Sequence, residues 1–89
     1  MICQEDISSI KAISAKYNIA KVLLFGSSLS DDIESGDIDL AVSGIDDSKF
    51  YQYYGELMLA LSKPVDLVSL SDDSKFTRMI RSEGRVLYG

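Results

Sequence analysis

The sequence predicts an α/β or α+β domain in which helices pack on a small, mixed β-sheet. Three observations lead to this fold class. Helical and strand-like periodicities alternate along the chain in the order αβαβαβα. The 89 residues suffice for one hydrophobic core and not for two, so residues 1–89 are expected to form a single domain. Hydrophobic residues make up 46% and charged residues 26%, as in ordinary globular proteins.

The first helix is expected from Glu5 and the first strand directly after it. The apolar residues at helical spacing are Ile7, Ile10, Ile13 and Tyr17. Asn18 stands where a helix often ends in the left-handed conformation. Ile19–Phe25 is a short, nearly continuous apolar run that Gly26 ends, which indicates a strand buried on both faces.

A short helix and a second strand are expected next. Ser27 can cap a helix that runs through about Ile33. Asp37–Val42 then alternates with the period of a strand. One face carries Ile38, Leu40 and Val42, and the other carries Asp37, Asp39 and Ala41.

The third helix is long and amphipathic, and Asp46, Asp47 and Ser48 offer N-terminal caps for it. Its apolar stripe consists of Phe50, Tyr53, Tyr54, Leu57, Met58 and Leu61. We interpret the aromatic residues and the methionine of this stripe as core packing rather than as a ligand site.

The last strand and helix follow Pro64. Val65–Leu70 is an apolar run interrupted by Asp66. Ser71, Asp72 and Asp73 then mark the start of a helix that Gly84 ends before Arg85 to Tyr88. Its apolar residues are Phe76, Met79 and Ile80.

Charge and composition exclude several classes of function. Fourteen acidic residues against nine basic ones give a net charge of −5, which argues against general binding to nucleic acids. A single cysteine and no histidine exclude an internal disulfide, a structural zinc site and a His-based triad. The chain has neither a signal-peptide pattern nor an apolar run long enough for a membrane span, so a soluble, cytoplasmic protein is expected.

Three aspartates stand out as candidate metal ligands. On a strand, Asp37 and Asp39 point to the same side, where a divalent cation such as Mg²⁺ would offset their mutual repulsion. Asp66 lies in an otherwise apolar strand, where an unpaired buried carboxylate would be costly. Two alternatives remain open for Asp66: it pairs with a lysine such as Lys63 or Lys21, or it lies at an exposed edge.

A second candidate feature is the junction of Phe25, Gly26, Ser27 and Ser28 between a strand and a helix. Glycine allows a tight turn and a close approach to a ligand, and the free N–H groups of a helix N-terminus attract phosphate. The junction lacks the lysine of a P-loop and the further glycines of a dinucleotide-binding fingerprint.

Together these features resemble the signature of the nucleotidyltransferase superfamily related to DNA polymerase beta: a strand, Gly26-Ser27, nine further residues, and then Asp37-Ile38-Asp39-Leu40. The small size, Asp66 and the ending Ile80 to Tyr88 are similar to its minimal nucleotidyltransferase branch, whose members are encoded beside HEPN-domain partners. The resemblance implies a nucleotidyltransferase-like palm.

The resemblance also implies a function, which is transfer of AMP from ATP to a hydroxyl group. Gly26, Ser27 and Ser28 would hold the triphosphate, and Asp37 and Asp39 would bind Mg²⁺. Asp66 would complete a second Mg²⁺ site or help to deprotonate the acceptor. The implied setting is an antitoxin that acts on a HEPN toxin, and a second chain, of its own kind or another, is expected to complete the site.

The sequence departs from the branch pattern after Gly-Ser. Basic residues are common there, whereas this chain reads Ser28, Leu29, Ser30, Asp31. Lys21 or the basic residues near the C-terminus could replace them, or pair with a helix end instead; the latter are Lys75, Arg78, Arg81 and Arg85. The alternative is therefore a catalytically weak antitoxin that neutralises its partner by contact alone.

Overall fold

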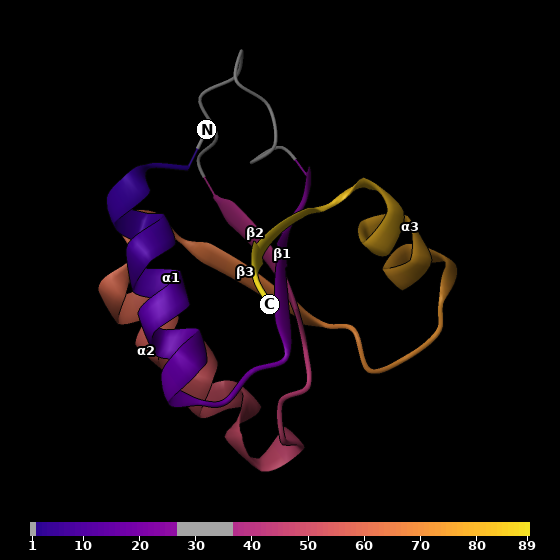
Figure 1. Cartoon of the computed structure of the whole chain (residues 1–89), viewed down its shortest axis with the longest axis horizontal. Helices are drawn as coiled ribbons and strands as arrows, with labels where there is room; N and C mark the ends of the chain where they lie inside the picture. Colours follow the sequence, from indigo (N-terminus) through magenta and orange to yellow (C-terminus); the bar gives the residue numbers. More distant parts are fainter. Residues whose placement is uncertain (1, 27–36) are drawn as a thin grey trace.

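The computed structural model describes residues 2–26 and 37–89 (Figure 1). Its elements are α1 Gln4–Lys16, β1 Lys21–Leu24, β2 Ile38–Ser43, the 3-10 turn η2 Asp47–Lys49, α2 Phe50–Ala60, β3 Val65–Ser69, α3 Lys75–Glu83 and β4 Arg85–Tyr88. The short helix expected from Ser27 to Ile33 lies outside the described residues.

The four strands form one mixed sheet in the order β3-β2-β1-β4. β1 runs antiparallel to both β2 and β4, whereas β2 and β3 are parallel. β1 and β2 are therefore central, and β3 and β4 are edge strands. The predicted fold class, a small mixed sheet with packed helices, is confirmed.

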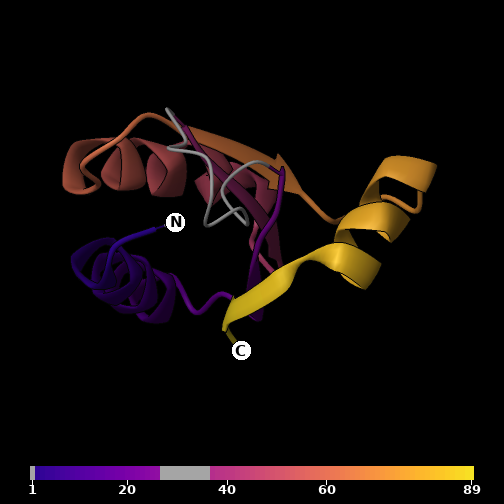
Figure 2. The same cartoon turned by 90° about the horizontal axis from the view of Figure 1, so that it is seen from above.

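The two faces of the sheet are covered differently. Figure 2 shows α1 and α2 on one side of the sheet and α3 on the other. On the first side, apolar side chains of β1 and β2 such as Leu24 and Leu40 pack against Ile10, Tyr53 and Leu57. On the α3 side a smaller cluster consists of Leu23, Ala41, Leu70 and Ile80, with Phe25 and Val68 packed against it.

Polar contacts fasten α1 to α2. The buried hydroxyl groups of Ser14 and Tyr53 lie 2.7 Å apart and share a hydrogen bond. Glu56 of α2 accepts hydrogen bonds from Lys16 Nζ, at 2.8 Å, and from the Tyr17 hydroxyl. Asn18 has a φ of +56°, so the predicted left-handed end of the first helix is confirmed.

The helix boundaries and faces differ from expectation in three places. Met58 is 54% exposed and does not belong to the core stripe of α2. Lys49 is the N-cap residue of α2 and makes no side-chain cap hydrogen bond, so the caps expected there are not formed. α3 is capped by Ser74, whose hydroxyl accepts from the Thr77 N–H while the Thr77 hydroxyl accepts from the Ser74 N–H.

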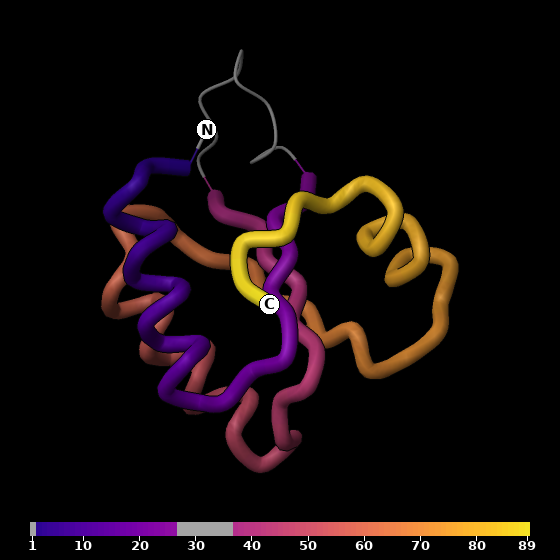
Figure 3. Tube along the Cα trace, in the orientation of Figure 1, coloured from indigo at the N-terminus to yellow at the C-terminus, as the bar shows by residue number. Residues whose placement is uncertain are grey.

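β4 was not expected from the sequence. Its four residues give too short an alternation to predict a strand, and the strand exists because Val86 and Arg85 pair with Leu23 and Leu24 of β1. The Cα trace in Figure 3 shows the chain returning along β1 to its C-terminus. In the part of the chain described, no helix is long and apolar enough to span a membrane.

Candidate active site

The candidate site is built on the α3 side of the sheet, where three strands bring one residue each into a row. Asp39 of β2 stands in register with Asp66 of the parallel strand β3. On the other side of Asp39, the Phe25 N–H donates to the Asp39 carbonyl oxygen at 3.1 Å. Phe25, Asp39 and Asp66 therefore form what we call the site row. The alternation of each strand puts these side chains on the face of Leu23, Ala41 and Val68.

Gly26 lies directly against the Asp39 carboxylate. Its φ is +68°, which L-residues with a Cβ adopt only with strain. A Cβ placed on Gly26 would stand 2.6 Å from Asp39 Oδ2. The sequence predicted a turn at this glycine, and the structure adds that the absence of a side chain makes room for the carboxylate.

Asp37 precedes β2 and is exposed. Because Asp37 lies outside the strand, its placement on the same side as Asp39 stays a prediction from the sequence. Ser27 and Ser28, the other predicted phosphate-binding residues, lie outside the described residues.

Asp66 is not buried, contrary to one expectation. It is exposed on β3, which is an edge strand, so the open alternative of an exposed edge is the one observed. Lys21 cannot be its partner, because Lys21 pairs with Ser43 at the opposite end of the strands. What distinguishes Asp66 is its register beside Asp39, not desolvation.

These residues fit a hard divalent cation. Carboxylate oxygens are the ligands that Mg²⁺ prefers, and one or two carboxylates with substrate phosphates are its usual set. The absence of a side chain at Gly26 lets the Asp39 carboxylate lie directly against the turn. Among residues 2–26 and 37–89, no three acidic or cysteine side chains converge closely enough to hold a single ion. Within the described residues, the site row offers two neighbouring carboxylates, Asp39 and Asp66.

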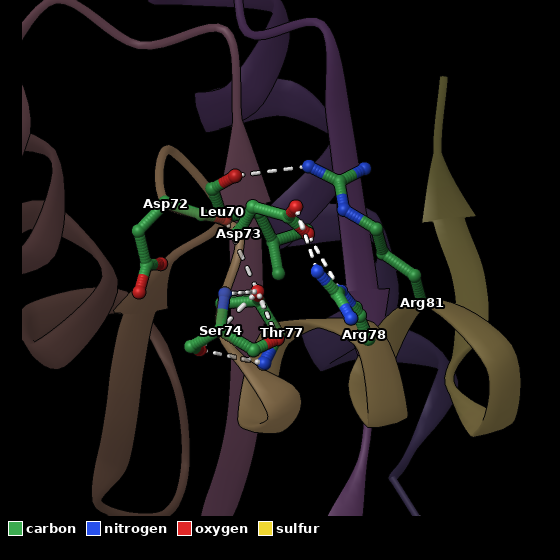
Figure 4. A network of polar contacts seen from close by, with 7 residues as sticks. All are labelled: Leu70, Asp72, Asp73, Ser74, Thr77, Arg78 and Arg81. Carbon is green, nitrogen blue, oxygen red and sulfur yellow. Dashed lines mark hydrogen bonds and ion pairs between the residues drawn. The ribbon is translucent and has the colours of Figure 1, made fainter.

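The basic residues considered as phosphate ligands are mostly engaged elsewhere. Lys21 lies about 16 Å along the chain from Gly26, at the far end of β1. Figure 4 shows Arg78 in a two-pronged contact with Asp73, at 2.8 and 2.9 Å, and Arg81 donating to the Leu70 carbonyl at 2.9 Å. Arg85 pairs with Leu24, so its backbone lies at the same end of the sheet as Gly26. Its side chain, however, lies on the face of Leu24, which is opposite to the face of Asp39.

The Arg78–Asp73 contact also shifts the pKa of both groups. Hydrogen bonding from Arg78 lowers the pKa of the Asp73 carboxyl below its usual value, and Asp73 raises the pKa of the Arg78 guanidinium. This pair links α3 to the loop that precedes it, and both of its side chains are exposed. We conclude that Arg78 has a structural contact that accounts for its position.

The sequence interpretation missed an aromatic contact next to the site row. The rings of Phe25 and Phe76 meet edge to face, with centroids 6.0 Å apart. Phe76 and Met79, two of the apolar residues of the last helix, are 48% and 44% exposed. Their spacing in the sequence was a signal of this exposure, because on a helix Phe76 and Met79 lie to one side of the buried Ile80.

Comparison with known proteins gives a consistent result. A family model described as "Polymerase beta, Nucleotidyltransferase" matches residues 8–89. The comparison with curated proteins found no match. Among solved structures, a toxin–antitoxin crystal structure with AMP-PNP is 26% identical with a TM-score of 0.75, and the match covers 93% of this chain and 73% of that one.

Two further structures are similar over nearly the whole chain. The tri-AMPylated HEPN toxin of Shewanella oneidensis in complex with the MNT antitoxin gives 26% identity and a TM-score of 0.73, covering 97% of this chain and 71% of that one. A toxin–antitoxin structure of MntA and HepT gives 25% identity and a TM-score of 0.73, covering 98% and 73%.

Proposed function

Because this chain belongs to the polymerase beta nucleotidyltransferase family, we propose that it transfers AMP from ATP to a hydroxyl group of a HEPN toxin and acts as that toxin's antitoxin. The observation that carries the proposal is the site row, in which Asp39 stands beside Asp66 and against Gly26. The similar structures support the choice of nucleotide and partner, since one contains AMP-PNP and another an AMPylated HEPN toxin. A reaction that consumes ATP also fits the cytoplasmic location expected from the sequence.

Each site residue has a role in this reaction. Asp37 and Asp39 hold Mg²⁺ together with the triphosphate oxygens, and Gly26 lets the triphosphate approach the backbone. Ser27 and Ser28 donate hydrogen bonds to the phosphates. Asp66 completes a second Mg²⁺ site or accepts the proton of the acceptor hydroxyl. Mg²⁺ held by these carboxylates would supply positive charge that offsets the charge on the attacking and leaving oxygens.

The bonds exchanged are those of a phosphoryl-type substitution. The acceptor hydroxyl gives up its proton to Asp66 or to solvent water, its oxygen forms a bond to the α-phosphorus of ATP, the bond from that phosphorus to the oxygen bridging to the β-phosphate breaks, and pyrophosphate leaves. The protein chiefly positions the two reactants and the carboxylates that offset the charge. In this proposal Asp37 and Asp39 therefore make the largest contribution to lowering the barrier.

The test is transfer of label from α-labelled ATP to the toxin in the presence of Mg²⁺. We expect the wild-type protein to label the toxin and Asp39→Asn to lose on the order of 100-fold in rate, because several kcal/mol of charge stabilisation disappear. Asp72→Asn makes the same charge change at an exposed loop position and is the matched control. Equal labelling by wild type and Asp39→Asn would refute the metal assignment.

Neutralisation by contact alone is the second candidate function. The observation that favours it is the engagement of Arg78 and Arg81 within the fold and the remote position of Lys21, which leave few described cations for a triphosphate. The discriminating variant is Asp37→Asn combined with Asp39→Asn. If this variant inhibits the toxin as well as wild type does without ATP, contact suffices; if inhibition requires both aspartates and ATP, transfer is the function.

A further inference from the structure

The site row is continuous with an apolar surface that the proposed chemistry does not use. We call Phe25, Phe76 and Met79 the apolar wall. Phe25 is itself a member of the site row, one strand away from Asp39. Phe76 reaches it from α3, with the two rings 6.0 Å apart and 82° between their planes. The path from Asp39 to the ring of Phe76 therefore has two steps. The first is the spacing of about 5 Å between the strand of Asp39 and Phe25, and the second is the contact between the two phenyl rings.

Phe25 packs partly against the core cluster on the α3 side, whereas Phe76 and Met79 of the wall remain about half exposed. α3 buries Thr77 and Ile80 against the sheet, whereas Phe76 is 48% and Met79 44% exposed. The opposite flank of the helix carries Arg78 and Arg81, whose partners are Asp73 and the Leu70 carbonyl (Figure 4). α3 therefore turns a basic flank toward the preceding loop and an apolar flank toward Phe25.

An acidic row that borders an aromatic surface matches the two ends of a nucleotide. A nucleoside triphosphate has a polyanionic end, which needs Mg²⁺ and carboxylates, and a flat base, which stacks on aromatic rings. One ribose separates the phosphates from the base. Its length is similar to the separation between Asp39 and Phe76. A base bound here would cover exposed phenyl and thioether surface that otherwise faces water.

We propose that the apolar wall is the base-binding subsite of the nucleotide, with Phe76 as the stacking residue and Phe25 and Met79 as its support. The inference rests on the proposed function, since it takes the phosphates to be held at the site row. Stacking energy depends more on the area of the aromatic face of the base than on the hydrogen-bonding groups at its edge. Purine nucleotides therefore bind more tightly here than pyrimidine nucleotides. The inference thus adds to the proposed function a residue, Phe76, that sets the preference for a purine base.

The test compares binding of ATP, UTP and inorganic tripolyphosphate, each with Mg²⁺, by calorimetry. Tripolyphosphate has the phosphates and no base. We expect Phe76→Ala to weaken ATP binding about tenfold, equivalent to about 1.4 kcal/mol and within the range of base–aromatic stacking. Tripolyphosphate binding stays unchanged, and the preference for ATP over UTP shrinks.

Two further variants separate stacking from folding. Phe76→Leu retains apolar volume against Phe25 and removes the π-face, so it loses ATP affinity without loss of thermal stability. Tyr51→Ala removes an aromatic ring that is 81% exposed on α2, on the other side of the sheet, and leaves ATP binding unchanged.

The possible failures are distinguishable. If wild type binds ATP and tripolyphosphate but Phe76→Ala weakens neither, or weakens both equally, the base subsite is refuted and the proposed function stands. If wild type binds neither ligand in the presence of Mg²⁺, the proposed function itself fails. If Phe76→Ala weakens association with the toxin and leaves ATP binding unchanged, the wall belongs to a protein contact and the subsite is refuted.

Discussion

Gly26 has two separate physical requirements at the level of the single residue. Its φ of +68° disfavours any residue with a Cβ, and the Asp39 carboxylate occupies the place where a Cβ would stand. The sequence predicts the first requirement, since glycine after a buried strand indicates a tight turn. The second depends on β2 lying beside β1, and only the sheet pairing reveals it.

Replacing Gly26 should therefore cost both stability and ligand binding. We expect Gly26→Ala to lower the free energy of unfolding by about 1–3 kcal/mol, through strain at positive φ, and to weaken Mg²⁺ binding by displacing Asp39. Gly55→Ala is the control, because a Cβ at Gly55 in α2 meets nothing within 4 Å. That variant should gain about 0.5–1 kcal/mol from helix propensity. Denaturant unfolding measures both, and equal effects at the two positions would contradict the assignment.

Single elements differ most from the sequence prediction where their environment decides their faces. Asp66 interrupts an apolar run that suggests a buried strand, yet β3 is an edge strand and the carboxylate reaches solvent. Phe76 and Met79 look like core residues of a helix, yet α3 is the helix that covers this face and buries only Thr77 and Ile80. Periodicity identifies the face of an element but not what lies opposite it.

The α1–α2 contact predicts a pH dependence of stability. Hydrogen bonds from Lys16, and next from Tyr17, lower the pKa of Glu56 below its usual value of 4.5. A lowered folded pKa means that the ionised carboxylate stabilises the fold above the unfolded pKa. This contribution is lost as the pH falls through the lower folded pKa.

The measurement is the difference in Tm between wild type and Glu56→Gln as a function of pH. We expect wild type to be more stable by a constant margin from pH 7 to about pH 5, and the margin to shrink below about pH 4. Glu83→Gln, which removes an exposed carboxylate from α3, is the matched control. A margin that grows toward acidic pH would contradict the sign of the argument.

At the scale of the whole molecule, the two faces of the sheet differ: one is covered by two helices, and the other carries α3 and the candidate site. α1 and α2 cover the first, and α3 lies on the side of the second (Figure 2). On that second face Asp66 is exposed and Asp39 is half-buried. Like charges in directly opposed strand positions are unfavourable, and Asp39 and Asp66 occupy such positions. We therefore expect a local electrostatic cost at this pair, which a bound cation would remove.

This cost can be measured in the absence and presence of Mg²⁺. Without Mg²⁺ we expect Asp66→Asn to raise Tm by about 1–8 °C, since it relieves a cross-strand repulsion of about 0.2–1 kcal/mol. Added Mg²⁺ should raise the Tm of wild type more than that of the variant. Asp47→Asn, at an exposed position in η2, controls for net charge. A lower Tm for Asp66→Asn without Mg²⁺ would contradict repulsion at this pair.

The sequence by itself determined the fold class, most of the helices and strands, and the motif of Gly26 with Asp37 and Asp39, because periodicity, turn residues and motif spacing are local properties of the chain. The tertiary structure decided the pairing of Asp39 with Asp66, the exposure of Asp66, the strand β4 and the contact between Phe25 and Phe76. Each of these depends on which segments become neighbours across the sheet. That choice is made by burying the apolar faces of all elements together, which no single segment of the sequence specifies.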